Sequence, residues 1–172
     1  MKRLIVSLLM ALTVSAVIFP AILFCEDIEV IEIKGLKIGM TKEEIERNVG
    51  KLPLNNITIA GVRGKYDDSG PVIIKFYEGK LDVFMFSFDP RYFDDILEAV
   101  KNKYPTIGCD NSVVTNAMGA SFNQVSCRLK DQSGSLSLSK FSNNINTSTL
   151  SLISDRWIKE TADKQKEKRK DL

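Results

Sequence analysis

Short stretches in which polar and apolar residues alternate constrain this fold more than any other feature of the sequence. They are clearest in three segments of the C-terminal third: SFNQVSCRLK (121–130), GSLSLSKF (134–141) and NTSTLSLIS (146–154). Successive side chains of a β-strand point to opposite faces, so Ser-Leu-Ser-Leu-Ser spacing puts leucines on one face and serines on the other. Turn-forming residues at 132–134 and 142–144 separate the segments. We therefore predict three half-solvated antiparallel strands whose leucines face the interior.

A β-hairpin is predicted in the middle of the chain. The β-rich runs VIIKFY (72–77) and LDVFMFSF (81–88) flank Glu78-Gly79-Lys80, in which Gly79 is able to adopt a positive φ. The second run is apolar on both sides, with Phe84, Phe86 and Phe88 on one face and Leu81, Val83 and Met85 on the other. We expect such a strand near the middle of a sheet, covered on both faces.

The remaining elements complete an α+β order. IEVIEIKG (28–35) and ITIAGV (57–62) read as strands, and Asp89 and Pro90 open a helix whose apolar residues recur at helical spacing until Pro105. A last helix begins around Trp157. The chain thus predicts an α+β fold of helix-then-antiparallel-meander units with a C-terminal helix. One domain covers residues 26–158, or two small units cover about 26–88 and 89–158. Residues 159–172 are expected to form a charged, solvated tail.

The segment IGMTKEEIERNVGKLP (38–53) reads as a short helix with both ends marked. Thr41 is placed to cap the helix, and Glu44 can return a hydrogen bond to the N–H of the cap residue. Met40 and Ile45 form a candidate hydrophobic staple across the first turn. Gly50 suits the position after the last turn, and Pro53 prevents continuation. Each marked residue therefore has a local structural role.

The same segment resembles the signature of the SmpA/OmlA family of small outer-membrane assembly lipoproteins. The resemblance covers roughly residues 35–53, and the fold motif consists of Gly39, Met40, Thr41, Glu44, Ile45, Gly50 and Pro53. The wider structural group is similar to the β-lactamase inhibitor protein, in which a small helical element packs on an antiparallel sheet, sometimes as two tandem units. The resemblance implies this fold and a role in the cell envelope.

The N-terminus has the layout of a secretory signal peptide. Lys2 and Arg3 precede the apolar run 4–19, and polar, acidic sequence begins at Glu26. Cleavage after Cys25 gives a signal peptide of residues 1–25, whereas cleavage after Ala16 would leave the apolar VIFPAILF on the exported chain. Two alternatives remain. Cys25 could be acylated, as in a lipoprotein, or residues 4–24 could be retained as a membrane anchor, because about 20 apolar residues span a bilayer.

Removal of Cys25 leaves two cysteines, Cys109 and Cys127, in a chain destined for an oxidising compartment. An even number of cysteines in this setting favours a disulfide between them. The bond would close a loop of about 19 residues and contribute roughly 3 kcal/mol by the chain-entropy estimate.

Charge and residue usage narrow the classes of function that we expect. The chain has 24 Lys and Arg against 22 Asp and Glu, and loss of Lys2 and Arg3 leaves a formally neutral protein, so we expect no nucleic-acid partner. The absence of histidine removes the commonest general base and the commonest zinc ligand. We expect no enzymatic activity and no cofactor or metal. Asp67-Asp68 could bind a hard cation, but an Asp-Asp-Ser-Gly run before a strand is far more often a turn. The third hypothesis is an enzyme that uses carboxylates with a bound cation.

These observations lead to a secreted or periplasmic, non-enzymatic protein that binds another envelope protein. The alternative is a membrane-tethered structural or assembly factor of the envelope, held through Cys25 or an uncleaved N-terminal helix. Membrane contact is expected only in that alternative.

Overall fold

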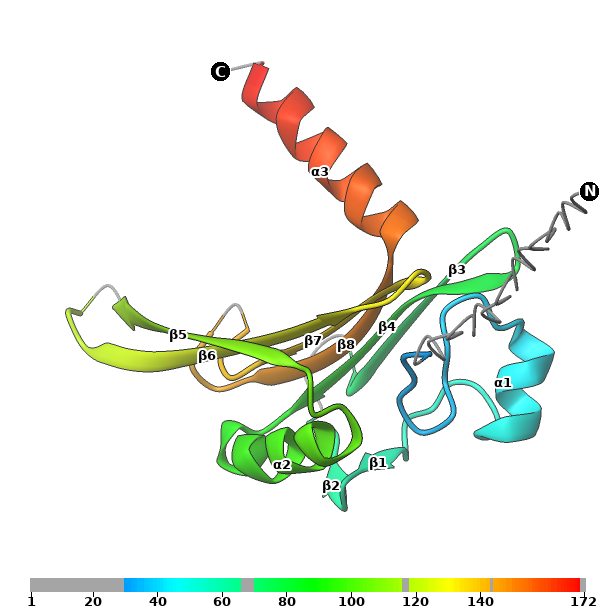
Figure 1. Ribbon diagram of the computed structural model, residues 1–172, viewed down its shortest axis with the longest axis horizontal. Helices are drawn as coiled ribbons and strands as arrows, with labels where there is room; N and C mark the ends of the chain where they lie inside the picture. Colours follow the sequence, from blue (N-terminus) through cyan, green and yellow to red (C-terminus); the bar gives the residue numbers. More distant parts are fainter. Residues whose placement is uncertain (1–29, 66–69, 116–117, 143, 171–172) are drawn as a thin grey trace, which may run out of the picture.

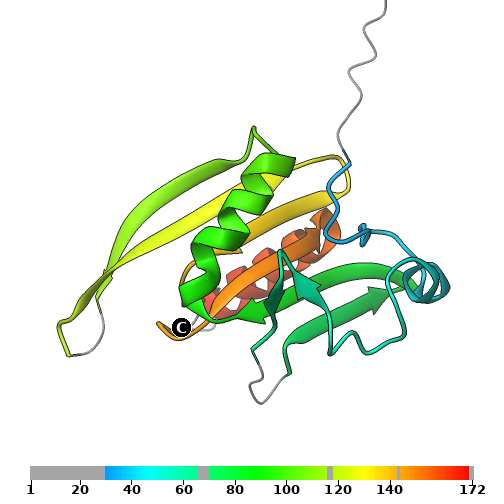
Figure 2. The same ribbon diagram turned by 90° about the horizontal axis from the view of Figure 1, so that it is seen from below.

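The computed structural model describes residues 30–65, 70–115, 118–142 and 144–170. It is an α+β protein, as the sequence predicts, built around one antiparallel sheet of six strands in the order β3-β4-β8-β7-β6-β5. Helix α2 and the two-stranded β1-β2 ribbon lie against one face of the sheet, and α3 extends from the opposite face (Figures 1 and 2). Helix α1 lies near one end of the sheet (Figure 1).

The order along the chain is helix then strands, twice, followed by a helix. The elements are α1 (Lys42–Asn48), β1 (Thr58–Ile59), β2 (Val62–Arg63), β3 (Val72–Tyr77), β4 (Lys80–Phe88), the 3₁₀ helix η1 (Pro90–Tyr92), α2 (Phe93–Lys103), β5 (Gly108–Thr115), β6 (Ser121–Lys130), β7 (Gly134–Ser139), β8 (Ser148–Ser154) and α3 (Asp155–Lys170). The last strand of each meander, β4 and β8, pair with one another, so strands from both halves of the chain share a single sheet.

The core lies between the sheet and α2. The predicted leucine stripes of β7 and β8 are buried, and so are the three phenylalanines of β4 and three apolar side chains of α2. The set is Phe84, Phe86, Phe88, Leu136, Leu138, Leu150, Leu152, Phe93, Ile96 and Val100. Removal of this much apolar surface from water is the main force that holds α2 on the sheet.

The helix ends follow the sequence signals. Thr41 and Glu44 form the complete capping box, with N–H to oxygen distances of 3.3 Å and 2.8 Å between them. Asp89 caps η1 through the N–H of Arg91, and Pro90 is the first residue of that turn. The hairpin prediction is confirmed too, because Glu78 and Gly79 (φ 49° and 75°) connect β3 directly to β4.

The predicted opening strand, 28–35, is wrong over its described part. Residues 33–36 form a tight turn in which Ile33 and Leu36 exchange backbone hydrogen bonds of 3.0 Å and 2.9 Å. Lys34 and Gly35 adopt positive φ values of 53° and 81°, which a strand does not allow. The turn buries Ile31, Ile33 and Leu36 together, and a straight strand could not bring all three to one side.

Residues 57–62 were expected to form one strand and instead contain a turn. Ala60 and Gly61, with φ values of 49° and 77°, separate β1 from β2. Positive φ at both central residues is the signature of the tight hairpin turn that suits twisted strands.

The C-terminal half has four strands where three were predicted, because the sequence pattern does not indicate β5. Its sequence begins Gly-Cys-Asp-Asn, and Gly, Asp and Asn all disfavour strands. Pairing with β6 along its whole length, from Gly108 with Arg128 to Thr115 with Ser121, overrides that local preference.

A register shift in β4 corrects the expected placement of Leu81. Lys75 pairs with Val83 and Phe76 pairs with Leu81, so Asp82 is an extra residue in β4. Leu81 therefore joins the core with Phe84 and does not lie beside Val83 as expected.

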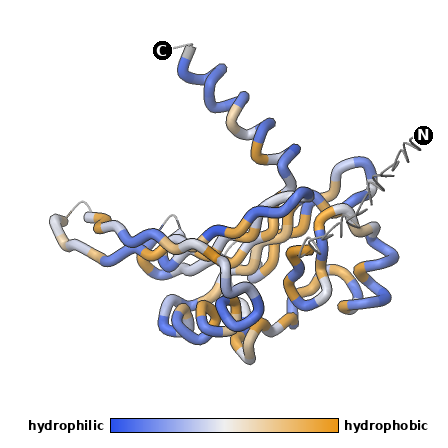
Figure 3. The backbone as a smooth tube through the Cα atoms, viewed as in Figure 1, coloured by the Kyte–Doolittle hydropathy of each residue, from blue (hydrophilic) through white to orange (hydrophobic). Residues whose placement is uncertain are grey.

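Strand β8 is not half-solvated as predicted. It lies between β4 and β7, and its outward residues Thr149 and Ser151 are only 6% and 5% exposed. The last helix also continues much further than its apolar residues suggest, to Lys170, and is hydrophilic along most of its length (Figure 3). Salt bridges at i, i+4 spacing, Arg156 with Glu160 and Glu160 with Lys164, support it.

Candidate functional site

The residues of the sequence motif lie in and around α1, away from β5. Ile45 is fully buried, and Met40 and Val49 pack against the same core. Gly39 donates its N–H to the carbonyl of Leu81 (2.9 Å), which ties the start of the helix to β4. Gly50 follows the last turn with φ 144°, and Pro53 lines a shallow apolar groove beside β3. These contacts hold the fold and bring no reactive groups together.

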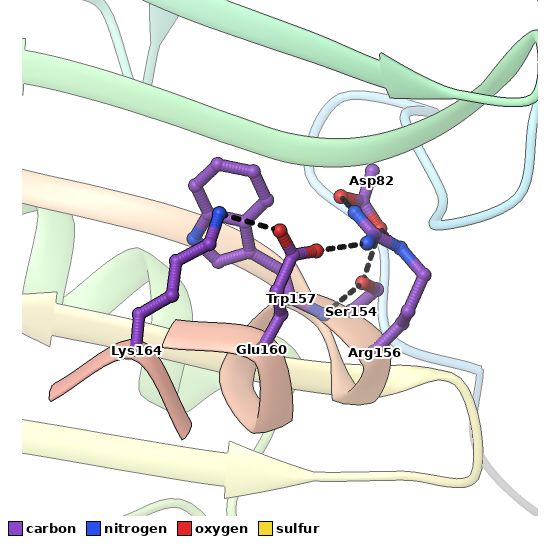
Figure 4. Close-up of polar contacts among 6 residues, drawn as sticks. All are labelled: Asp82, Ser154, Arg156, Trp157, Glu160 and Lys164. Carbon is purple, nitrogen blue, oxygen red and sulfur yellow. Dashed lines mark hydrogen bonds and ion pairs between the residues drawn. The ribbon is translucent and has the colours of Figure 1, made fainter. Parts of the chain in front are cut away.

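A cluster of polar and charged side chains lies at the start of α3 (Figure 4). Asp82 accepts hydrogen bonds from the Ser154 hydroxyl and from the Arg156 guanidinium, whose Nε lies 3.1 Å from Oδ1. Ser154 also accepts the N–H of Trp157 (3.0 Å), so it caps the helix. The bulge in β4 is what turns Asp82 toward these partners.

The charges of this cluster stabilise one another and hold α3 on the sheet. Hydrogen bonding to Asp82 raises the pKa of Arg156, and hydrogen bonds from Lys164 and then Arg156 lower the pKa of Glu160. Arg156 also stacks on Tyr77, with its guanidinium carbon 3.7 Å from the centre of the ring. Every charge here has a partner, and the group fixes the first turn of α3 to the sheet.

Strand β5 is the open edge of the sheet and the best candidate for a binding site. It has eight residues, pairs only with β6 among the described strands, and forms the rim in Figures 1 and 2. Val113 is 66% exposed and Val114 37% exposed. Long edge strands without bulges, prolines or lysines offer their backbone to another chain, and β5 has none of these protections.

The other edge, β3, is less open. It is shorter, with six residues, and its register is interrupted by the bulge. Two of its side chains are engaged by α3, because Lys75 lies 4.4 Å from the ring centre of Trp157 and Tyr77 stacks with Arg156. The two edges therefore differ in how well they could receive a further strand.

The disulfide reveals which backbone groups of β5 face outward. Cys109 and Cys127 are bonded and lie directly opposite each other, with their Cα atoms 4.0 Å apart. A separation this short marks a pair that does not exchange hydrogen bonds, so Cys109 directs its N–H and C=O away from β6. By alternation, Asn111, Val113 and Thr115 do the same. The carbonyl of Val125, opposite Asn111, accordingly accepts from Lys140 on the other side (2.9 Å).

A groove of about 520 Å³ adjoins the outer end of this edge. Its lining residues are Val114, Thr115, Phe122, Gln124, Phe141, Asn144 and Ile145. Phe122 and Phe141 meet edge to face, with ring centres 6.0 Å apart. The described lining contains no charged side chain, so the groove suits an apolar group.

Gln124 holds the groove in shape. Its side chain oxygen accepts the N–H of Phe141 (2.9 Å), and its side chain nitrogen donates to the carbonyl of Phe141 (3.1 Å). The side chain thus replaces the backbone pairing with β6 that ends after Lys140. Phe141 is fixed against Phe122 before any partner arrives, which lowers the cost of binding.

Of the residues in this region, only Cys109 and Cys127 could be recognised from the sequence. The adjacent valines, Val113 and Val114, were the available signal. Neighbouring residues of a strand face opposite sides, so two consecutive valines in an otherwise polar strand place one on each face. The roles of Phe141 and Ile145 depend on a loop whose position no local pattern specifies.

Comparison with known protein families, with characterised proteins and with solved structures finds no match to this chain. Within the described residues no helix is long and apolar enough to cross a membrane, and no three Cys, Asp or Glu side chains gather as a metal site would require. The signal peptide 1–25, Cys25 and the pair Asp67-Asp68 lie outside the described residues.

Proposed function

We propose that this is a secreted or periplasmic, non-enzymatic protein that binds another protein of the cell envelope through the β5 edge. The observation that carries the proposal is the combination of an eight-residue edge strand that has no bulge, proline or lysine with a preformed apolar groove beside it. Edge strands and apolar pockets are two recurrent means by which proteins recognise extended segments of their partners.

The disulfide and the N-terminal segment support the compartment. The bond between Cys109 and Cys127 is compatible with an oxidising environment, in which such bonds persist. The basic residues and apolar run at the N-terminus have the layout of an export signal. The resemblance of residues 35–53 to the SmpA/OmlA signature agrees with an envelope role and remains a prediction.

Capture from envelope extracts tests the proposal. Tagged protein is cross-linked in intact cells, purified, and its partners are identified by mass spectrometry. We expect one stoichiometric envelope protein that is lost when Val113→Pro blocks the edge and retained with the exposed helix variant Lys164→Ala. Recovery of no stoichiometric partner at several salt concentrations would contradict the proposal.

The second candidate is a membrane-tethered structural or assembly factor of the envelope. Cys25, at the end of the apolar run, is the residue that favours it. Intact mass of the processed protein separates the two candidates. A chain that starts at Glu26 supports the secreted form, and a diacylated Cys25 or a retained Met1 supports the tethered form.

A further inference from the structure

We propose that the partner contributes one extended segment that adds to β5 as an antiparallel seventh strand, with an apolar residue in the groove and a basic residue four positions later. This inference rests on the proposed function and specifies the chemistry of the partner at the same site. Three features of β5 support it: the direction of its free backbone groups, the groove beside Val114, and the charge of Asp110.

The backbone of β5 sets the shape of the ligand. The N–H and C=O groups of Asn111 and Val113 point away from β6, and none of the described residues pairs with them. Alternating donors and acceptors at this spacing are matched by the backbone of another strand. All strand pairs of the sheet are antiparallel, and antiparallel pairing is the more stable kind, which sets the direction of the added strand.

The groove fixes one side chain of the ligand. Val114 pairs with Phe122, and both line the groove, so the ligand residue opposite Val114 has its side chain on the same face. A charged side chain at that position would lose water without gaining a partner. The ligand residue opposite Val114 is therefore apolar.

Asp110 fixes a second side chain. It lies on the same face of β5 as Val114, is exposed, and makes no ion pair with the residues that the structure describes. Its direct neighbour in β6 is the uncharged Ser126, and Arg128, the diagonal neighbour on the same face, makes no ion pair with it. A lysine or arginine opposite Asp110 forms a favourable cross-strand pair. In an antiparallel strand that residue comes four positions after the apolar one.

The charge of Asp110 disfavours a second copy of this chain as the partner of β5. Two β5 strands paired about a two-fold axis at Ser112, the register that uses all four outward-facing residues of the strand, place Asp110 opposite Val114. Each carboxylate would then lie against an apolar groove and lose part of its hydration. A partner with a basic residue at this point avoids that cost.

The first test is binding of a fluorescein-labelled peptide, Ser-Ile-Thr-Thr-Thr-Lys-Ser, to protein purified after expression of the full-length chain, followed by fluorescence anisotropy. N-methylation of the first and third threonines blocks the N–H groups that face Val113 and Asn111. We expect at least roughly tenfold weaker binding. N-methylation of the isoleucine and the second threonine blocks outward N–H groups, and we expect binding within about threefold of the parent. Equal effects of both pairs, or no saturable binding at millimolar peptide, would overturn the inference.

The second test exchanges charge. Asp110→Lys is expected to weaken binding of the lysine peptide and to strengthen binding of a peptide with glutamate at that position. Each affinity should change by about fivefold at low salt and by less at high salt. The unchanged far-ultraviolet spectrum and melting temperature of the variant provide the folding control. An unchanged preference of the variant for the lysine peptide over the glutamate peptide would contradict the proposed register. So would tighter binding of a peptide in which lysine precedes isoleucine by four positions.

Partner capture separates failure of this inference from failure of the proposed function. A partner that wild type and Val113→Pro capture equally leaves the binding function standing and removes β5 as its site. A concentration-dependent dimer in sedimentation that Val113→Pro abolishes would identify a second copy as the occupant and overturn the inference. Loss of the partner with Val113→Pro, together with the peptide results above, supports it.

Discussion

Asp131 is the residue whose role was least visible in the sequence. One carboxylate oxygen accepts the N–H of Ser133 (2.7 Å) and of Gly134 (3.0 Å), which closes the turn between β6 and β7. The other oxygen accepts the N–H of Ile31 at 2.8 Å, from a segment 100 positions away. The turn could be predicted from the residues at 132–134, but the link to Ile31 could not.

Asp131→Ala should destabilise the protein in a pH-dependent manner. Burial by itself raises the pKa of Asp131, but the hydrogen bonds from Ile31, Ser133 and Gly134 outweigh it and lower the pKa. A carboxyl whose pKa is lowered by folding stabilises the native state above its unfolded value, about 3.9, and this contribution disappears as pH falls through the folded value. We expect a loss of about 2 kcal/mol at pH 7 and a smaller loss below about pH 4.

Urea denaturation of wild type and Asp131→Ala at several pH values measures this difference. Asp110→Ala serves as control, because it removes an exposed carboxylate and should change the free energy of unfolding by less than about 0.5 kcal/mol. A difference between wild type and Asp131→Ala that does not change from pH 7 to pH 3 would contradict the role assigned to the carboxylate.

Asp82 anchors α3, and the exposed ion pairs of that helix do not. Asp82→Ala leaves Arg156 and Ser154 without their shared acceptor, and we expect a loss of about 2 kcal/mol in unfolding free energy. Lys164→Ala removes only an exposed pair with Glu160, so less than about 0.5 kcal/mol should be lost. A double-mutant cycle of Asp82→Ala with Arg156→Ala should give a favourable coupling energy, and additive effects would show that the pair does not interact.

At the scale of elements, the sequence predicted what depends on local pattern. Strands β6, β7 and β8, the β3-β4 hairpin and α2 all carry a clear periodicity or turn signal, and each was found. Strand β5 was missed because Gly-Cys-Asp-Asn has no strand preference of its own, and the 33–36 turn was misread because its apolar residues alternate. In both places contacts from distant parts of the chain outweigh local preference.

Two proline substitutions in adjacent residues of β5 test which backbone groups face outward. Val113→Pro removes an N–H that points away from β6, whereas Ser112→Pro removes one that bonds to β6. We expect Ser112→Pro to cost about 3 kcal/mol or more and Val113→Pro clearly less, as measured by thermal or urea unfolding. Equal losses would mean that the assignment of inward and outward groups is wrong.

At the scale of the whole molecule, the α+β class and the order of elements could be predicted, but the strand neighbours could not. The pairing of β4 with β8 joins residues about 70 positions apart, such as Val83 and Ile153, and leaves no local trace in the sequence. The candidate binding edge was equally hidden, because the edge position of β5 is set by this strand order.

The disulfide stabilises the molecule at the base of the proposed binding strand. Replacement of Cys109 and Cys127 together by alanine should lower the free energy of unfolding by roughly 3 kcal/mol, since the bond closes a short loop in the unfolded chain. Urea denaturation of the oxidised protein and of the double variant gives the comparison. Identical stabilities would show that the bond contributes nothing beyond the β5-β6 pairing.

The central position of β8 also determines when the sheet can form during synthesis of the chain. Strand β8 is the last strand of the chain, yet it lies between β4 and β7. While the chain is still being synthesised, β4 and β7 are therefore two exposed apolar edges without the strand that lies between them in the folded protein. The sheet can close only after residue 154 has emerged, so an unfinished chain exposes two more strand edges to aggregation than a finished one does.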